Sequence, residues 1–113
     1  MIVREFLKKN EIAIINEGEK MELGQPFCCD LLSVVMNRGS VGCTWVTIMA
    51  NLNTIAVAKL VEASCVILAE GVSLDEMSLK KAQEEGVTVL SSQLPIYETA
   101  KKVDEYLNAR TSI

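Results

Sequence analysis

The sequence predicts an α/β fold, a three-layer α/β/α sandwich with a mostly parallel sheet, formed by a single domain over residues 1–113. Short apolar segments alternate with helical segments through the last two-thirds of the chain. Such alternation is typical of parallel strands joined by right-handed crossovers, with helices on both faces of the sheet. Half of the residues are hydrophobic but only 4% are aromatic, which indicates an aliphatic core. The length suits one domain with a real core.

Apolar periodicity and the polar breaks between segments place the individual elements. In chain order we expect a helix over 2–9, a strand over 12–15, an extended segment over 25–29, a helix over 31–36, a strand over 44–49, a helix over 54–62, a strand over 65–68, a helix over 73–86, a strand over 87–90 and a helix over 96–107.

The early elements rest on short signals. The first helix has apolar residues spaced along one face, and the strand after it is a short apolar run that ends in the polar turn 16–19. Pro26 has no N–H to donate, so the extended segment around it is expected at the start or edge of a strand. Asp30 is a preferred N-cap type and is expected to cap the helix that follows.

The later elements have stronger signals. Segment 44–49 is β-branched and aromatic, and segment 65–68 is fully apolar, as buried parallel strands are. Ser73 precedes Glu76 by three residues, which matches a capping box at the start of a helix. Gly86 stands where that helix should end in a left-handed residue.

Charge and hydropathy exclude two classes of partner. The net charge is −4 and the basic residues are scattered, whereas a nucleic-acid surface needs clustered Lys and Arg. The sequence contains no run of about 18 apolar residues that would span a membrane, and its start lacks a signal peptide. We therefore expect a cytoplasmic protein that binds neither nucleic acid nor membrane.

The chain contains four cysteines and no histidine. Without histidine there is no Ser-His or Cys-His pair for nucleophilic catalysis. The cysteines form no CxxC motif, so no metal site is predicted, and buried thiols are expected in a reducing compartment. Cys28 and Cys29 are adjacent, and a redox role for this pair remains an alternative.

Polar side chains gather where the predicted parallel strands end. In an open α/β sheet, ligands bind outside the carboxyl ends of the strands. The residues selected by this rule are Asp30, Thr47, Asn51, Asn53, Glu70, Gly71, Ser91 and Ser92. Each also has a structural alternative: Asp30 or Asn53 could only cap a helix, and Gly71 could only supply a positive φ.

Four segments carry a resemblance to a known family. Residues 28–36, 44–58, 66–86 and 86–103 together resemble the DRTGG domain, which is similar to the N-terminal domain of HPr kinase/phosphorylase. The resemblance implies a small α/β module with a regulatory role and no activity of its own. In other proteins such domains lie beside CBS domains in pyrophosphatase-like enzymes or inside phosphotransacetylase-type enzymes, and stand-alone versions lie near hydrogenase subunits.

The sequence departs from the family at the residues that give it its name. Asn51-Leu52 stands where Asp-Arg would fall, and Ala69-Glu70-Gly71 stands where Thr-Gly-Gly would fall. Only Gly71 matches. If the family arginine holds an anionic ligand, this chain lacks that positive charge. Arg38 is the nearest arginine in the sequence.

The sequence therefore predicts a non-catalytic regulatory or adaptor domain that binds a small ligand at the strand ends and acts on a protein partner, such as a hydrogenase or a kinase. The identity of any ligand or cofactor stays open. The alternative is a small metal-assisted enzyme acting on a phosphate compound, with Asp30 and Glu70 as its carboxylates. A homodimer is also expected, through the apolar positions Ile96, Val103, Tyr106 and Leu107 of the last helix.

Overall fold

A five-stranded sheet with strand order β1-β5-β4-β3-β2 forms the centre of the computed structural model, which describes residues 2–111. Strands β2 to β5 are parallel, and β1 pairs antiparallel with β5 at one edge. The elements are α1 (Ile2–Lys9), β1 (Ala13–Asn16), β2 (Pro26–Cys28), α2 (Leu32–Arg38), β3 (Thr44–Thr47), α3 (Leu52–Leu60), β4 (Cys65–Leu68), α4 (Glu76–Glu85), β5 (Val89–Ser91) and α5 (Ile96–Thr111).

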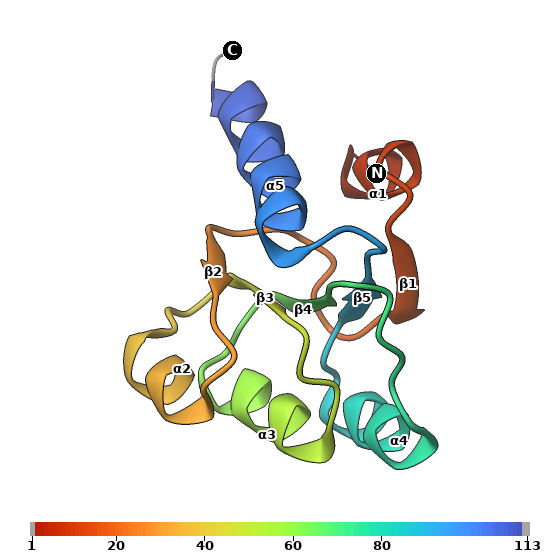
Figure 1. Cartoon of the computed structure of the whole chain (residues 1–113), viewed down its shortest axis with the longest axis vertical. Helices are drawn as coiled ribbons and strands as arrows, with labels where there is room; N and C mark the ends of the chain where they lie inside the picture. The colour runs from red at the N-terminus through yellow and green to blue at the C-terminus, as the bar shows by residue number, and fades with distance from the viewer. Residues whose placement is uncertain (1, 112–113) are drawn as a thin grey trace.

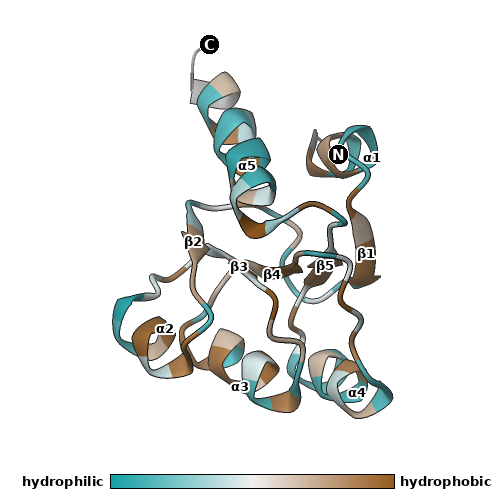
Figure 2. Ribbon diagram, viewed as in Figure 1, coloured by the Kyte–Doolittle hydropathy of each residue, from teal (hydrophilic) through white to brown (hydrophobic). Residues whose placement is uncertain are grey.

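Helices cover both faces of the sheet, as the sequence predicts. Helices α2, α3 and α4 lie on one face, and α1 and α5 lie on the other (Figure 1). The strands between them are mainly apolar, whereas the helices carry hydrophilic residues as well (Figure 2). The three-layer α/β/α prediction is therefore confirmed.

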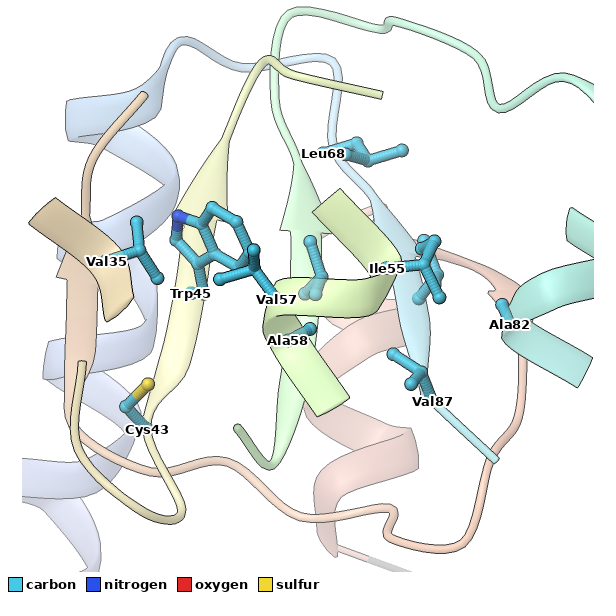
Figure 3. Close-up of a cluster of buried hydrophobic side chains, with 11 residues drawn as sticks. Val35, Cys43, Trp45, Ile55, Val57, Ala58, Leu68, Ala82 and Val87 are labelled. Carbon is cyan, nitrogen blue, oxygen red and sulfur yellow. The ribbon is translucent and has the colours of Figure 1, made fainter. Parts of the chain in front are cut away.

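Each face of the sheet has its own core. Under α2, α3 and α4, Trp45 and Ile55 are fully buried, and the Trp45 indole N–H donates to the Cys29 carbonyl at 2.8 Å (Figure 3). On the other face, the rings of Phe6 and Tyr106 join α1 to α5, with centroids 4.8 Å apart. Val103 of α5 is fully buried in this second core.

The burial of α5 corrects the predicted dimer surface. Val103 is 0% exposed, so it cannot contact a second chain. Ile96, Tyr106 and Leu107 are half-buried and pack against the same core cluster. The apolar periodicity of α5 thus reflects packing within the chain, and no separate dimer face follows from it.

Helix starts differ from the predictions at three positions. Leu31, not Asp30, is the N-cap residue of α2 and makes no side-chain cap bond. Asn51 caps α3, which begins two residues earlier than expected, so Asn53 lies within the helix. Asp75 caps α4 by accepting from the Ser78 N–H at 2.7 Å, in place of the predicted Ser73. Gly86 ends α4 with φ 70°, as predicted.

The segment 17–25, called the crossing segment below, runs from one edge of the sheet to the other past the amino ends of the parallel strands. Its Gly18 N–H donates to the Thr88 hydroxyl at 3.0 Å, and its Gly24 N–H donates to the Thr44 hydroxyl at 2.8 Å. A Cβ on Gly18 would lie 2.2 Å from the Gly86 carbonyl oxygen. The chain can approach so closely only because glycine has no side chain.

Candidate functional site at the carboxyl edge of the sheet

The register of the sheet brings the predicted site residues to one edge. Thr47 at the end of β3 lies opposite Leu68 of β4, and Leu68 lies opposite Ser91 of β5. The loops after these strands therefore start side by side. This carboxyl edge is where open α/β sheets bind ligands.

Asp30 joins the loop after β2 to the end of β3. Its Oδ1 accepts from the Thr47 hydroxyl at 2.6 Å and from the Ile48 N–H at 3.1 Å. Thr47 is fully buried, whereas Asp30 is exposed. Both bonds use the same carboxylate oxygen, so Oδ2 is left for solvent or a ligand. This long-range contact also explains why Asp30 does not cap α2.

Asn51 has a structural role in addition to its place at the edge. Its side-chain oxygen accepts from the Thr54 N–H at 3.0 Å and lies 3.3 Å from the Thr54 hydroxyl. That hydroxyl donates to the Met49 carbonyl at 2.9 Å. Thr54, a residue that the sequence reading did not select, thus completes the turn, and the Asn-x-x-Thr spacing was the signal for it. Asn53 is exposed in the first turn of α3.

Glu70 and Gly71 form a left-handed pair directly after β4. Their φ angles are 61° and 68°, a region that costs a non-glycine residue about 1–2 kcal/mol. The turn is held because the Glu70 N–H donates to Leu94 and the Gly71 N–H to Ser92, both at 2.9 Å. The prediction of positive φ at Gly71 is confirmed. The exposed Glu70 carboxylate makes no hydrogen bond or ion pair with the side chains that the structure describes, those of residues 3–109.

The two serines after β5 differ in accessibility. Ser91 is half-buried at the strand end. Ser92 is buried, its hydroxyl lies 2.9 Å from that of Thr99, and it accepts from the Leu94 N–H at 3.1 Å. The Ser92 hydroxyl is thus used to fix the start of α5, and Ser91 is the more accessible of the pair.

The carboxyl edge is acidic. The loops that follow the parallel strands contain Asp30, Glu70 and Asp75 and no lysine or arginine. Hydrogen bonds from Ser78 lower the pKa of the Asp75 carboxyl, which keeps it charged. Arg38 lies at the end of α2, which runs away from this edge. It therefore does not stand in for the arginine that the family motif would place after β3.

Three of the four cysteine thiols have a raised pKa. Burial, and next the charge of Asp30, raise the pKa of the Cys28 thiol. Burial raises the pKa of Cys43 as well, and that of Cys65 to about 12. A raised pKa disfavours the thiolate, which is the nucleophile and the metal ligand. Within residues 2–111, no group of three or more acidic or thiol side chains could hold a metal ion.

Three hollows in the described surface lie away from the centre of this edge. The smallest, of about 280 Å³, is lined partly by Gln93 and Leu94, which follow Ser92 directly. A Cβ on Gly71 would lie 2.6 Å from the Gln93 amide oxygen, so Gln93 covers the left-handed turn. The other two lie between α1 and α5 and at the amino edge of the sheet. Asp30, Asn51, Glu70 and Ser91 line none of these three hollows.

No helix within residues 2–111 is long and apolar enough to cross a membrane.

No protein-family model matches the sequence, and no curated protein matches it either. Among solved structures, the chain is similar to the CBS and DRTGG domains of the regulatory region of Clostridium perfringens pyrophosphatase, in complex with the activator diadenosine tetraphosphate. The TM-score is 0.75 at 12% sequence identity, and the match covers 91% of this chain and 46% of that one. The chain thus spans about half the length of its structural neighbour, and it has a DRTGG-like α/β fold.

Proposed function

We propose that the chain is a regulatory module that binds a small ligand at the carboxyl edge of its sheet and acts on a protein partner. The observation that carries this proposal is the shared fold with a regulatory region that binds a nucleotide activator. The strained turn at Glu70 supports the location, because strained backbone is concentrated at functional sites. The group proposed to contact the ligand comprises Asp30, Asn51, Glu70 and Ser91.

Charge restricts the ligand that this edge can accept. The activator of the neighbour is a polyphosphate, and the loops at this edge offer carboxylates without lysine or arginine. Like charges repel strongly at close range. We therefore propose that a polyphosphate binds here only together with a divalent cation, and that an uncharged or cationic compound binds without one.

A thermal-shift screen tests the site. The screen covers nucleotides including diadenosine tetraphosphate, acyl phosphates and divalent metals, each alone and in combination, together with uncharged nucleosides and cationic amines. A compound present at about one hundred times its Kd adds about 2.7 kcal/mol of stability. Glu70→Gln should abolish that shift, whereas Glu84→Gln on the exposed side of α4 should retain it. A shift that survives both Glu70→Gln and Asp30→Asn would place the ligand elsewhere, and no shift with any compound would remove the proposed ligand-binding role.

Exposed apolar residues beside the same edge offer a surface for a partner. They follow strand ends or lie in the first turns of α3, α4 and α5: Leu31 (60% exposed), Ile48 (43%), Leu52 (39%), Met77 (70%) and Tyr97 (69%). We propose that a protein partner, a second copy of the chain or an enzyme such as a hydrogenase or a kinase, binds here. Light scattering at micromolar concentration tests the homodimer, and a purely monomeric mass would refute it.

The metal-assisted enzyme remains the alternative proposal. It needs Asp30 and Glu70 to share a cation, and among residues 2–111 they do not gather with a third acidic or thiol ligand. Turnover of a phosphate compound that is lost in both Asp30→Asn and Glu70→Gln would favour the enzyme over the regulatory module.

A further inference from the structure

A hollow separate from the carboxyl edge lies at the opposite edge of the sheet, where the parallel strands begin. Its volume is about 420 Å³, which falls within the range of small-molecule sites. One wall is the crossing segment, the other is the end of α3 with the turn into β4, and the floor is the segment 86–88 that leads into β5. It shares no residue with the carboxyl edge. We call it the amino-edge pocket.

Hydrogen bonds fix the wall that the crossing segment provides. The Glu19 N–H donates to the Gly86 carbonyl at 2.8 Å, and the Gly18 N–H donates to the Thr88 hydroxyl at 3.0 Å. The Thr88 hydroxyl in turn donates to the Lys20 carbonyl. The backbone beside the pocket is thus tied to the segment 86–88 on both sides of Glu19. The pocket is preformed, so a ligand would not have to order this wall.

The inner surface of the amino-edge pocket is mainly aliphatic. Ala58 and Val87 are buried, and Ala63 is half-buried beside them. The two hydroxyls that line the pocket, on Ser64 and Thr88, already donate to backbone carbonyls. The interior therefore suits a short aliphatic group rather than a polar one.

The rim carries both signs of charge. Lys20 and Lys59 supply two ammonium groups, and Glu19 and Glu62 supply two carboxylates. The only ion pair among these four is Lys59–Glu19, whose N–O distance is 3.8 Å and whose side chains are 48% and 73% exposed. Such an exposed pair contributes at most about 1 kcal/mol. Lys20 and Glu62 make no ion pair among the described side chains of residues 3–109.

We propose that the amino-edge pocket binds a small zwitterion with an aliphatic body, the chemistry of a free aliphatic α-amino acid. The carboxylate of the ligand pairs with Lys20 or Lys59, its ammonium group pairs with Glu62 or Glu19, and its side chain lies against Ala58 and Val87. A ligand with one charge pairs with either the lysines or the glutamates of the rim, but not with both. An uncharged ligand pairs with neither.

Isothermal titration of the full chain with three probes of similar shape tests the proposal. L-leucine carries both charges, 3-methylbutylamine carries only the ammonium group, and 4-methylpentanoate carries only the carboxylate. L-leucine should bind about fivefold more tightly than either other probe, because each of the others loses one exposed ion pair worth about 1 kcal/mol. Equal affinities for the three probes, or no heat from L-leucine at millimolar concentration, would overturn the proposal.

Variants locate the binding and separate it from the carboxyl edge. Lys20→Met and Glu62→Gln should each weaken L-leucine binding by about fivefold. The matched control is Lys81→Met, because Lys81 lies on α4 and pairs there with Glu85, away from the pocket. Glu70→Gln should leave L-leucine binding unchanged, so failure of the carboxyl-edge site and failure of this one give different results. Loss of binding in Lys81→Met or Glu70→Gln but not in Lys20→Met would refute the pocket, provided that circular dichroism shows each variant folded.

Discussion

Replacing Asn51 and Asn53 by alanine should change stability in opposite directions. Asn51→Ala removes the side-chain oxygen that accepts from the Thr54 N–H at 3.0 Å. Loss of an N-cap costs about 1 kcal/mol, so the free energy of unfolding should fall by about that amount. Asn53 lies inside α3 and is exposed. Asn53→Ala therefore exchanges a weak helix former for the best one and should raise stability by a few tenths of a kcal/mol, roughly 0.5.

Urea denaturation followed by circular dichroism measures both changes. The midpoint should fall for Asn51→Ala and rise slightly for Asn53→Ala, with the same m-value in both. Asn51→Asp is the matched control, since an aspartate caps equally well. Equal destabilisation by the two alanine variants, or a larger loss for Asn53→Ala, would show that the α3 start is assigned wrongly. The same result sets the baseline for ligand studies, because Asn51→Ala weakens the fold even when it has no ligand role.

Three further changes test other parts of the structure. Glu62→Gly relieves a non-glycine residue at φ 57° and should raise stability by about 0.5–1 kcal/mol in urea. Gly18→Ala places a Cβ 2.2 Å from the Gly86 oxygen and should lower the urea midpoint by the equivalent of about 1–3 kcal/mol. In the control Gly42→Ala the new Cβ meets open space, so stability falls only by the strain of an alanine at positive φ. Burial raises the pKa of Cys65 from 9.0 to about 12. As pH rises, the Cys65 thiol therefore loses its proton in the unfolded chain before it does so in the folded chain. Stability should therefore fall as pH rises above about 9, and Cys65→Ala should flatten this fall.

The central strands and the two-sided layering could be predicted because they depend on local pattern. Segment 65–68 is confirmed residue for residue as β4, since four buried apolar residues leave little alternative. The strand predicted over 44–49 is two residues longer than β3, because β3 ends where Ile48 turns toward Asp30. The positive φ angles at Gly71 and Gly86 could also be predicted, because glycine is the residue that adopts them most readily.

Helix starts could not be predicted where two preferred cap residues lie close together. Ser73 and Asp75 are both preferred N-cap residues, and only the path of the loop after β4 determines that Asp75 caps α4. Asp30 was read as a cap because its competing partner, Thr47, lies 17 residues away. The local sequence contains no trace of that contact. The same limit applies to the amino-edge pocket, whose walls come from three separate segments of the chain.

The crossing segment has a consequence for how the chain folds. Its bond from Gly18 to Thr88 spans 70 residues, and β1 pairs with β5 across a similar separation. Contacts of such long range close late and slow folding, because the loop entropy must be lost first. During synthesis, β1 therefore has no strand to pair with until β5 has left the ribosome. We expect the α2–β3–α3–β4 unit to form first and the amino-terminal part to close over it last, which makes β1 the edge most exposed to pairing with other chains while folding is incomplete.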